Sequence, residues 1–134
     1  MTTITPIDLK FIEEAEFDLG IKFPVAYRRK MMRHNGGSVL LKSECYQLHP
    51  FLDSSDECST QNTSQSVVRQ TQLERLAQKL PDDIIVIGRS DEGHLLVLLM
   101  MGTGNVDERV FWFDINSREL GVAANEFSEL NLIG

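Results

Sequence analysis

The sequence predicts an α+β fold, with one domain over residues 1–134 in which helices pack on a mainly antiparallel sheet. Apolar residues recur at helical spacing over the first 37 residues, whereas after Asp83 they form short runs separated by turn signals. Strands joined by such short turns pair in the antiparallel direction. A chain of 134 residues is also long enough to bury a core without metal or disulfide staples.

A helix is predicted from Pro6 to Leu19. Thr5 is a typical N-cap, proline fits the first helical turn, and Asp8 stands at the capping-box position. Gly20 can adopt a positive φ without a Cβ clash, so it is expected to end the helix. The residues at helical spacing that predict the buried face are Ile7, Phe11, Ile12, Ala15 and Leu19.

A second helix is predicted to begin at Phe23-Pro24, which makes a helical hairpin with the first. Tyr27 and Met31 share one face, and we expect Tyr27 to be a core aromatic with its hydroxyl at the rim of the core. Asn35-Gly36-Gly37 is expected to stop the helix in a positive-φ turn.

The middle of the chain is predicted to hold two short strands, an exposed loop and one helix. The strands are residues 39–42 and 45–49 around a turn at 43–44, and the polar stretch 53–66 is the loop. The middle helix should end at Pro81. Its core-facing residues, from their helical spacing, would be Leu73, Leu76, Ala77 and Leu80.

The last third of the chain is predicted to be strands followed by a short C-terminal helix. The strands are 84–87, 95–101, 109–113 and 119–123. Trp112 must face the opposite side of its strand from Phe111 and Phe113, so it is either a core residue or an interface anchor. The final helix spans residues 125 to about 132, with Asn125 as its cap and two residues facing inward, Phe127 and Leu130.

The charge is negative and unevenly distributed. The formal net charge is −7, and residues 80–134 carry ten acidic side chains but only Arg89, Arg109 and Arg118. Such a field repels phosphate backbones and anionic membranes and attracts basic partners, so we expect no direct binding to nucleic acid or to a membrane. The alternative interpretation is that the acidity only keeps the protein soluble.

The sequence is typical of a cytoplasmic protein. Its first residues lack the basic and apolar segments of a signal peptide, and the longest apolar run, residues 95–101, is too short to span a bilayer. Cys45 and Cys58 form no metal-binding pattern, and we expect reduced thiols, although a disulfide between them stays possible at this point.

No pattern of catalytic residues is present, so the sequence predicts a protein that is not an enzyme and uses no metal or other cofactor. Cys45 and His49, four residues apart on one strand, would lie about 13 Å apart along it, beyond hydrogen-bond reach. Three acidic pairs stand at turns or strand ends. They are either solvated turn residues or a partner-facing acidic patch, and these candidate residues are Asp82, Asp83, Asp91, Glu92, Asp107 and Glu108.

Several short motifs follow one another along the chain: Leu19-Gly20, Phe23-Pro24, Tyr27 and Asn35-Gly36-Gly37, then Leu80-Pro81-Asp82 before a strand. Their order and spacing resemble the "LG…LP…Y…NGG" pattern of the SMI1/KNR4 family, also called the SUKH superfamily, over nearly the whole chain. Backbone geometry explains most of them as a helix stop, a helix start and a turn. The motif residues expected to be structural are Leu19, Gly20, Pro24, Tyr27, Asn35, Gly36 and Gly37.

The resemblance implies binding rather than catalysis. Many bacterial members of the family are immunity proteins that neutralise toxins of competing cells, and fungal members are regulatory scaffolds. An acidic C-terminal half fits a basic nuclease or deaminase toxin as the partner. The first hypothesis is therefore an immunity protein that binds a cognate toxin. The alternative is a regulatory or scaffold module with an endogenous protein partner, and a monomer is favoured over a homodimer.

Overall fold

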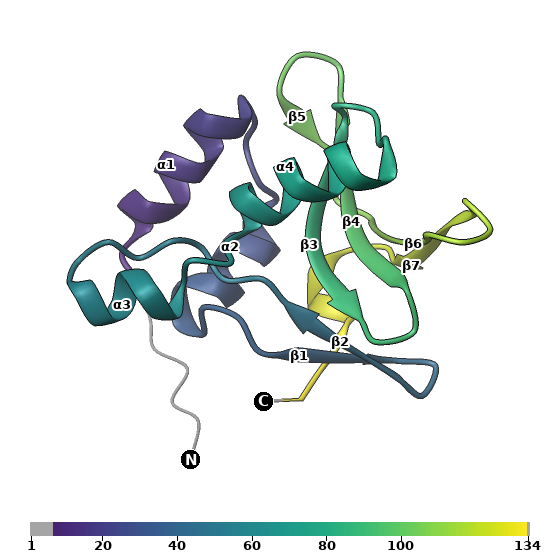
Figure 1. Ribbon diagram of the computed structural model, residues 1–134, viewed down its shortest axis with the longest axis horizontal. Helices are drawn as coiled ribbons and strands as arrows, with labels where there is room; N and C mark the ends of the chain where they lie inside the picture. The colour runs from purple at the N-terminus through teal and green to yellow at the C-terminus, as the bar shows by residue number, and fades with distance from the viewer. Residues whose placement is uncertain (1–6, 134) are drawn as a thin grey trace.

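In the computed structural model, which describes residues 7–133, helices lie along one side of a curled antiparallel sheet (Figure 1), and the predicted α+β class is confirmed. The helices are α1 (Leu9–Leu19), α2 (Val25–Arg33), α3 (Glu57–Asn62), α4 (Val67–Gln78) and the 3₁₀ turn η1 (Phe127–Glu129). The strands are β1 (Ser38–Leu41), β2 (Glu44–Leu48), β3 (Ile84–Ser90), β4 (His94–Met101), β5 (Asn105–Val106), β6 (Val110–Asp114), β7 (Leu120–Ala124) and β8 (Asn131–Leu132).

The strands follow the order β7-β6-β4-β3-β2-β1-β8, and β5 pairs with β4 outside this path. Strand β4 lies inside the sheet and is buried on both faces, which explains why residues 95–101 read as a continuous apolar run. Its alternate residues enter two different apolar clusters. Leu96 and Leu98 face the first cluster, and Leu95 and Val97 face the second.

The first apolar cluster joins one face of the sheet to α1, α2 and η1. Phe11 and Ile12 of α1, Tyr27 and Met31 of α2, and Phe127 of η1 pack there on the strands. The second cluster lies on the opposite face and includes Leu80, Ile84, Val86, Leu95, Val97, Phe111 and Phe113.

Two arginines help to enclose the second cluster. The guanidinium groups of Arg109 and Arg118 lie 5.1 Å from the ring centroids of Phe111 and Phe113, respectively. Arg118 also donates a 2.8 Å hydrogen bond from Nη1 to the carbonyl of Gln78. The turn between β6 and β7 is thereby tied to the end of α4, and the sheet curls around its second cluster.

Helix α4 covers an edge of β3 that β2 leaves unpaired. Strand β2 pairs with β3 only at residues 88–90. Beyond that point, the Thr71 hydroxyl accepts a 2.9 Å hydrogen bond from the Val86 N–H and donates a 3.3 Å bond to the Val86 carbonyl. Arg75 Nε donates to the Ile84 carbonyl at 3.1 Å. Side chains of α4 therefore take the place of a neighbouring strand.

The predicted helical hairpin is confirmed, but the predicted start of its first helix is wrong. The N-cap of α1 is Asp8, whose carboxylate accepts from the Lys10 N–H, so Ile7 and Asp8 precede the helix. The expected cap Thr5 and first-turn Pro6 lie outside the described residues. Gly20 ends α1 with φ 68°, as predicted, and Gly36 and Gly37 have φ values of 123° and 97° after α2.

The turn between β1 and β2 lies one residue earlier than predicted. Lys42 and Ser43, rather than Ser43 and Glu44, form it, and both have positive φ, as a two-residue turn that matches the twist of its strands requires. The prediction that residues 53–66 form only a loop is also wrong, because they contain helix α3. The Asp56 side chain accepts a hydrogen bond from the Ser59 N–H and caps this helix.

The predicted inner face of the middle helix is wrong. Leu73 and Leu76 are 44% and 82% exposed, and Ala77 is exposed as well. Only Leu80, which follows the helix, is buried, as predicted. The residues that α4 buries are Val67, Thr71 and Glu74, because the helix faces a hydrogen-bonding strand edge rather than an apolar sheet face.

The predicted C-terminal helix is reduced to the three residues of η1, whose N-cap is Glu126 rather than Asn125. Residues 131–132 form β8, which pairs with β1. Phe127 and Leu130 are buried, as predicted. Cys45 and Cys58 are both free and exposed, so they do not pair. Within residues 7–133, none of the helices is long and apolar enough to cross a bilayer.

Candidate functional site

The family-like motif residues form the packing around α2. The Tyr27 ring contacts the rings of Phe23, Phe51 and Phe127, with centroids 5.0–5.8 Å away. Tyr27 is fully buried and its hydroxyl has no hydrogen-bond partner within residues 7–133, so the expectation of a hydroxyl at the rim is wrong. Burial also raises the pKa of this phenol far above its ordinary value.

Asn35 ties the turn after α2 to the segment after β2. Its Nδ2 donates to the Phe51 carbonyl at 2.9 Å, and its Oδ1 accepts from the Phe51 N–H at 2.7 Å. One side-chain amide thus pairs both backbone groups of a fully buried residue. Tyr27 and Asn35 thus hold the core together, and of the motif residues only Pro24 lines the groove described below.

The structure separates the three predicted acidic pairs. Asp82-Asp83 and Asp107-Glu108 lie at one end of the β3–β4 hairpin. There the Asp83 carbonyl accepts a hydrogen bond from the Met100 N–H, and the Asp107 N–H donates one to the Leu99 carbonyl. Asp91-Glu92 forms the turn at the opposite end (Figure 1). A seven-residue β3 spans roughly 20 Å, so the six acids do not form one patch.

Asp91 and Glu92 instead belong to another group, here called the hairpin-end surface, which includes Glu44, Asp91, Glu92, His94, Trp112 and Asp114. The residues of this surface lie where β2 begins, where β3 turns into β4 and where β6 ends. His94 lies at its centre. Its Nδ1 is 2.6 Å from a Glu44 oxygen, and its Nε2 is 3.2 Å from an Asp114 oxygen.

Trp112 supplies an aromatic surface beside these charges. It is half-buried, and its ring lies edge to face with that of His94 at a centroid distance of 6.3 Å. The ring packs so closely on Gly121 of β7 that a Cβ on Gly121 would lie 2.4 Å from it. Trp112 is therefore part core and part surface, between the two interpretations that the sequence left open.

The pKa values reflect the negative character of this surface. The hydrogen bond to Glu44 is the largest cause that raises the pKa of His94, with further contributions from the charges of Glu44 and Asp114. Hydrogen bonds from the backbone of Ser117 and Asn116 lower the pKa of Asp114. Burial, and then the carboxylates nearby, raises the pKa of Tyr46 to about 12.

One trio of residues has the composition of a metal site. Glu44, Glu92 and His94 each offer a ligand atom, and these atoms lie within 4.8 Å of one another. However, both ring nitrogens of His94 face carboxylate oxygens, and only a protonated imidazolium donates from both nitrogens. A metal would need a deprotonated ring nitrogen. We therefore interpret His94 as an imidazolium that pairs with Glu44 and Asp114, and not as a metal ligand.

The His94 cluster makes the stability depend on pH. A folded-state pKa above the ordinary 6.5 means that the folded protein binds the proton more tightly than the unfolded chain. This contribution is complete below the unfolded pKa and is lost as the pH rises through the folded pKa. His94→Gln should therefore lower the free energy of unfolding by about 1 kcal/mol at pH 6, since the side chain is only 25% exposed, and by less at pH 9.

Urea unfolding of both proteins at several pH values measures this difference. His34→Gln, at an exposed histidine, is the control and should show no such trend. A His94→Gln effect that is the same at pH 6 and pH 9 would contradict the imidazolium assignment.

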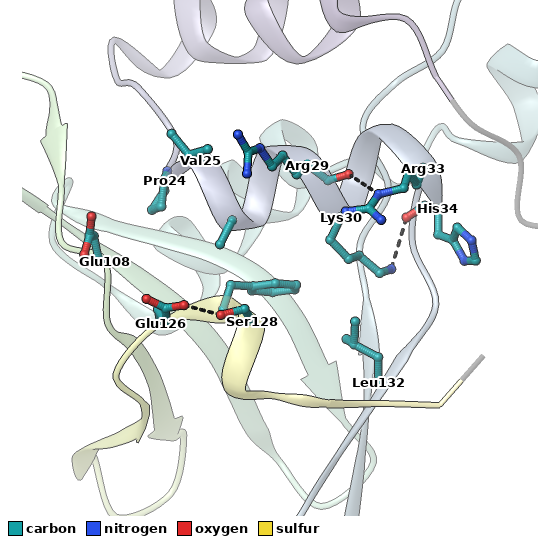
Figure 2. Close-up of a pocket in the computed structure, with 12 residues that line it drawn as sticks. Pro24, Val25, Arg29, Lys30, Arg33, His34, Glu108, Glu126, Ser128 and Leu132 are labelled. Carbon is teal, nitrogen blue, oxygen red and sulfur yellow. Dashed lines mark hydrogen bonds between the residues drawn. The ribbon is translucent and has the colours of Figure 1, made fainter.

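A second surface, here called the α2 groove, lies between α2 and the C-terminal segment of η1 and β8 (Figure 2). Its volume is about 790 Å³. Cations from α2 line it on one side, and Glu108 and Glu126 lie at the end near Pro24. The side chains that line it are Pro24, Val25, Ala26, Arg29, Lys30, Arg33, His34, Glu108, Glu126, Phe127, Ser128 and Leu132.

Lys30 has a local partner in this groove. Its ammonium group donates to the His34 carbonyl at 3.0 Å and to the Gly36 carbonyl, so it stabilises the C-terminal end of α2. Partial burial lowers its pKa to about 8. Arg29 lies one turn before Arg33, whose Nε donates to the Arg29 carbonyl at 3.5 Å.

Sequence reasoning found only Asp91, Glu92 and Trp112 of the hairpin-end surface, and it missed the rest of that surface and the α2 groove. Glu44, His94 and Asp114 come from three strands that are distant in sequence, and only the register of the sheet brings them together. The one available signal was the position of His94 beside the acidic turn 91–92. The α2 groove had no sequence signal, because its opposite side is the unforeseen strand β8.

Comparison with models of known protein families gives a match over nearly the whole chain. Residues 6–131 match the family described as SMI1 / KNR4 family (SUKH-1). None of the curated proteins searched matches the sequence.

Proposed function

Because the chain belongs to the SMI1/KNR4 family (SUKH-1), we propose that it is a non-enzymatic immunity protein that binds and neutralises a cognate toxin. The family includes immunity proteins, and its domains bind partner proteins. In this proposal the protein covers the active site of the toxin in the cytoplasm of the protected cell. It acts through binding alone, as a monomer with a single toxin domain.

The hairpin-end surface is the observation that carries this proposal. Three carboxylates, from Glu44, Glu92 and Asp114, gather around one histidine, and Asp91 precedes Glu92 in the same turn. Such a surface attracts a basic protein electrostatically and speeds the association. Trp112 lies among these charges, and a half-buried tryptophan is a typical anchor of a protein–protein interface. A nuclease or deaminase toxin with a basic cleft fits both features.

The partner can be identified by expressing the tagged chain in its own host and purifying what binds at low and at moderate salt. The proposal expects a basic toxin domain that is lost as salt rises, and whose toxicity the protein suppresses. Recovery of a housekeeping protein without toxicity would favour the regulatory or scaffold alternative instead.

Charge reversal tests which acidic residues take part. Asp91→Lys/Glu92→Lys should weaken toxin binding by roughly tenfold or more at low salt, mainly through a slower association rate, because it inverts the charge of the hairpin-end surface. The matched control is Asp82→Lys/Asp83→Lys, which makes the same change in charge at the opposite end of the β3–β4 hairpin.

Surface plasmon resonance at two salt concentrations separates the two double variants. The control should retain at least most of the affinity. If both variants bind as the wild type does, the acidic surface is not the binding site. If both lose affinity equally, only the overall charge of the protein matters.

A further inference from the structure

The α2 groove carries a charge opposite to that of the rest of the protein. The chain has 20 acidic and 13 basic residues, yet one wall of the α2 groove presents Arg29, Lys30 and Arg33. Within residues 7–133, none of these three forms an ion pair, whereas Arg28, Arg89 and Arg109 each pair with a carboxylate. The positive charge of this wall is therefore not neutralised within the described part of the protein.

Most of this charge is available to a ligand. The Lys30 ammonium is bound to backbone carbonyls, and Arg33 uses its Nε for one long bond of 3.5 Å. The terminal guanidinium nitrogens of Arg29 and Arg33 donate to no group within residues 7–133, and guanidinium groups pair with carboxylates in a bidentate manner. His34 lies at the same end of the groove (Figure 2).

Between these cations and the two glutamates at its far end, the groove is mostly apolar. Ala26 and Phe127 lie along its length, and Val25 and Leu132 line it with exposed fractions of 58% and 40%. A volume of about 790 Å³ is within the range of sites that enclose a small ligand or a few residues of a peptide. The groove thus offers apolar contact next to unpaired cations.

The edge of the sheet beside the groove favours a peptide over other anions. Within residues 7–133, strand β8 pairs with β1 on one side and no strand pairs with its other edge, which can therefore bond to an extended chain. Glu108 and Glu126, at the far end of the groove, would repel a uniformly anionic ligand such as a nucleic acid or an anionic bilayer. A short segment with acidic residues only near Arg29 and Arg33 avoids this repulsion.

We propose that the α2 groove binds an extended acidic segment of a protein partner. Carboxylates of the segment pair with Arg29 and Arg33, and an apolar side chain packs against Val25 and Leu132, the exposed apolar residues of the lining. The proposal does not rest on the immunity function, because the groove and the hairpin-end surface share no residue and select partners of opposite charge.

A pair of labelled peptides tests the proposal in fluorescence polarisation. One peptide of seven residues carries two glutamates at one end and apolar residues over the rest, and the other has lysine in place of each glutamate. The acidic peptide should bind at least tenfold more tightly than the basic one, and Arg29→Glu/Arg33→Glu should remove this preference. Arg29→Gln/Arg33→Gln serves if the charge-reversed variant is poorly folded, and it should weaken binding in the same direction.

The matched control is Arg69→Glu/Lys79→Glu, which changes two exposed cations outside the groove by the same charge. It should bind the acidic peptide as the wild type does. Equal binding of both peptides, or an equal loss in both charge-reversed variants, would overturn the proposal. Binding to phosphatidylserine vesicles that depends on Arg29 and Arg33, without peptide binding, would overturn it in favour of a membrane surface.

Discussion

Asn35→Ala should lower the free energy of unfolding by about 2–3 kcal/mol, because it leaves two backbone groups of Phe51 without partners. Phe51 is fully buried and contacts the rings of Phe23 and Tyr27, so water cannot readily replace the lost amide. The segment after β2 would then be held less firmly against the turn that follows α2.

Urea denaturation followed by circular dichroism measures this loss. Asn62→Ala is a suitable control, because Asn62 is an exposed residue at the end of α3 and its removal should change stability by no more than about 0.5 kcal/mol. Equal stability of Asn35→Ala and the wild type would show that the side-chain amide is not required to hold Phe51.

Thr71→Val should have a similar or larger effect, about 2–4 kcal/mol. The replacement keeps the shape of a fully buried side chain but removes the hydroxyl that both accepts from the Val86 N–H and donates to its carbonyl. Because the unpaired edge of β3 has no neighbouring strand at this point, the two backbone groups would stay buried without partners.

Thr71→Ser separates the hydroxyl from the methyl group. It keeps both hydrogen bonds and should cost only about 1 kcal/mol, the contribution of one buried methyl. Hydrogen exchange of the Val86 amide gives a local readout, and it should become faster in Thr71→Val but not in Thr71→Ser. A valine variant as stable as the wild type would mean that α4 does not support the edge of β3.

The N-terminal helices were predictable because their signals are local. Gly20 ends α1 through its own backbone freedom, and Pro24 precedes α2 because its missing N–H costs nothing there. The turn at Asn35-Gly36-Gly37 was also predicted from backbone geometry. The bonds of Asn35 to Phe51 were not predictable, because they join residues 16 positions apart.

Helix α4 shows where apolar spacing misleads. Leu73 and Leu76 form a regular stripe in the sequence, but this stripe faces the solvent. The buried positions are Thr71 and Glu74, polar residues that bond to the edge of β3 and to Arg89, respectively. The spacing of hydrophobic residues cannot reveal the buried face of a helix when that face consists of polar side chains that bond to a strand.

The candidate sites were only partly predictable for a similar reason. The acidity of the C-terminal half indicated electrostatic binding, and the turn at Asp91-Glu92 was correctly placed. The sequence could not show that Asp82-Asp83 lies at the other end of the same hairpin. Nor could it show that β2 and β6 bring Glu44 and Asp114 to His94, since that depends on strand order and register.

The open edge of β7 has a consequence for the protein at high concentration. This strand ends the sheet, contains no charged residue, and exposes Leu120 and Val122 to about half of their surface. Within residues 7–133 no strand pairs with its outer edge, so its backbone groups there can serve as a template for the same strand of another molecule. At neutral pH the net charge of −7 holds the molecules apart. Acidification removes this repulsion, so aggregation through β7 would begin as the carboxylates are neutralised.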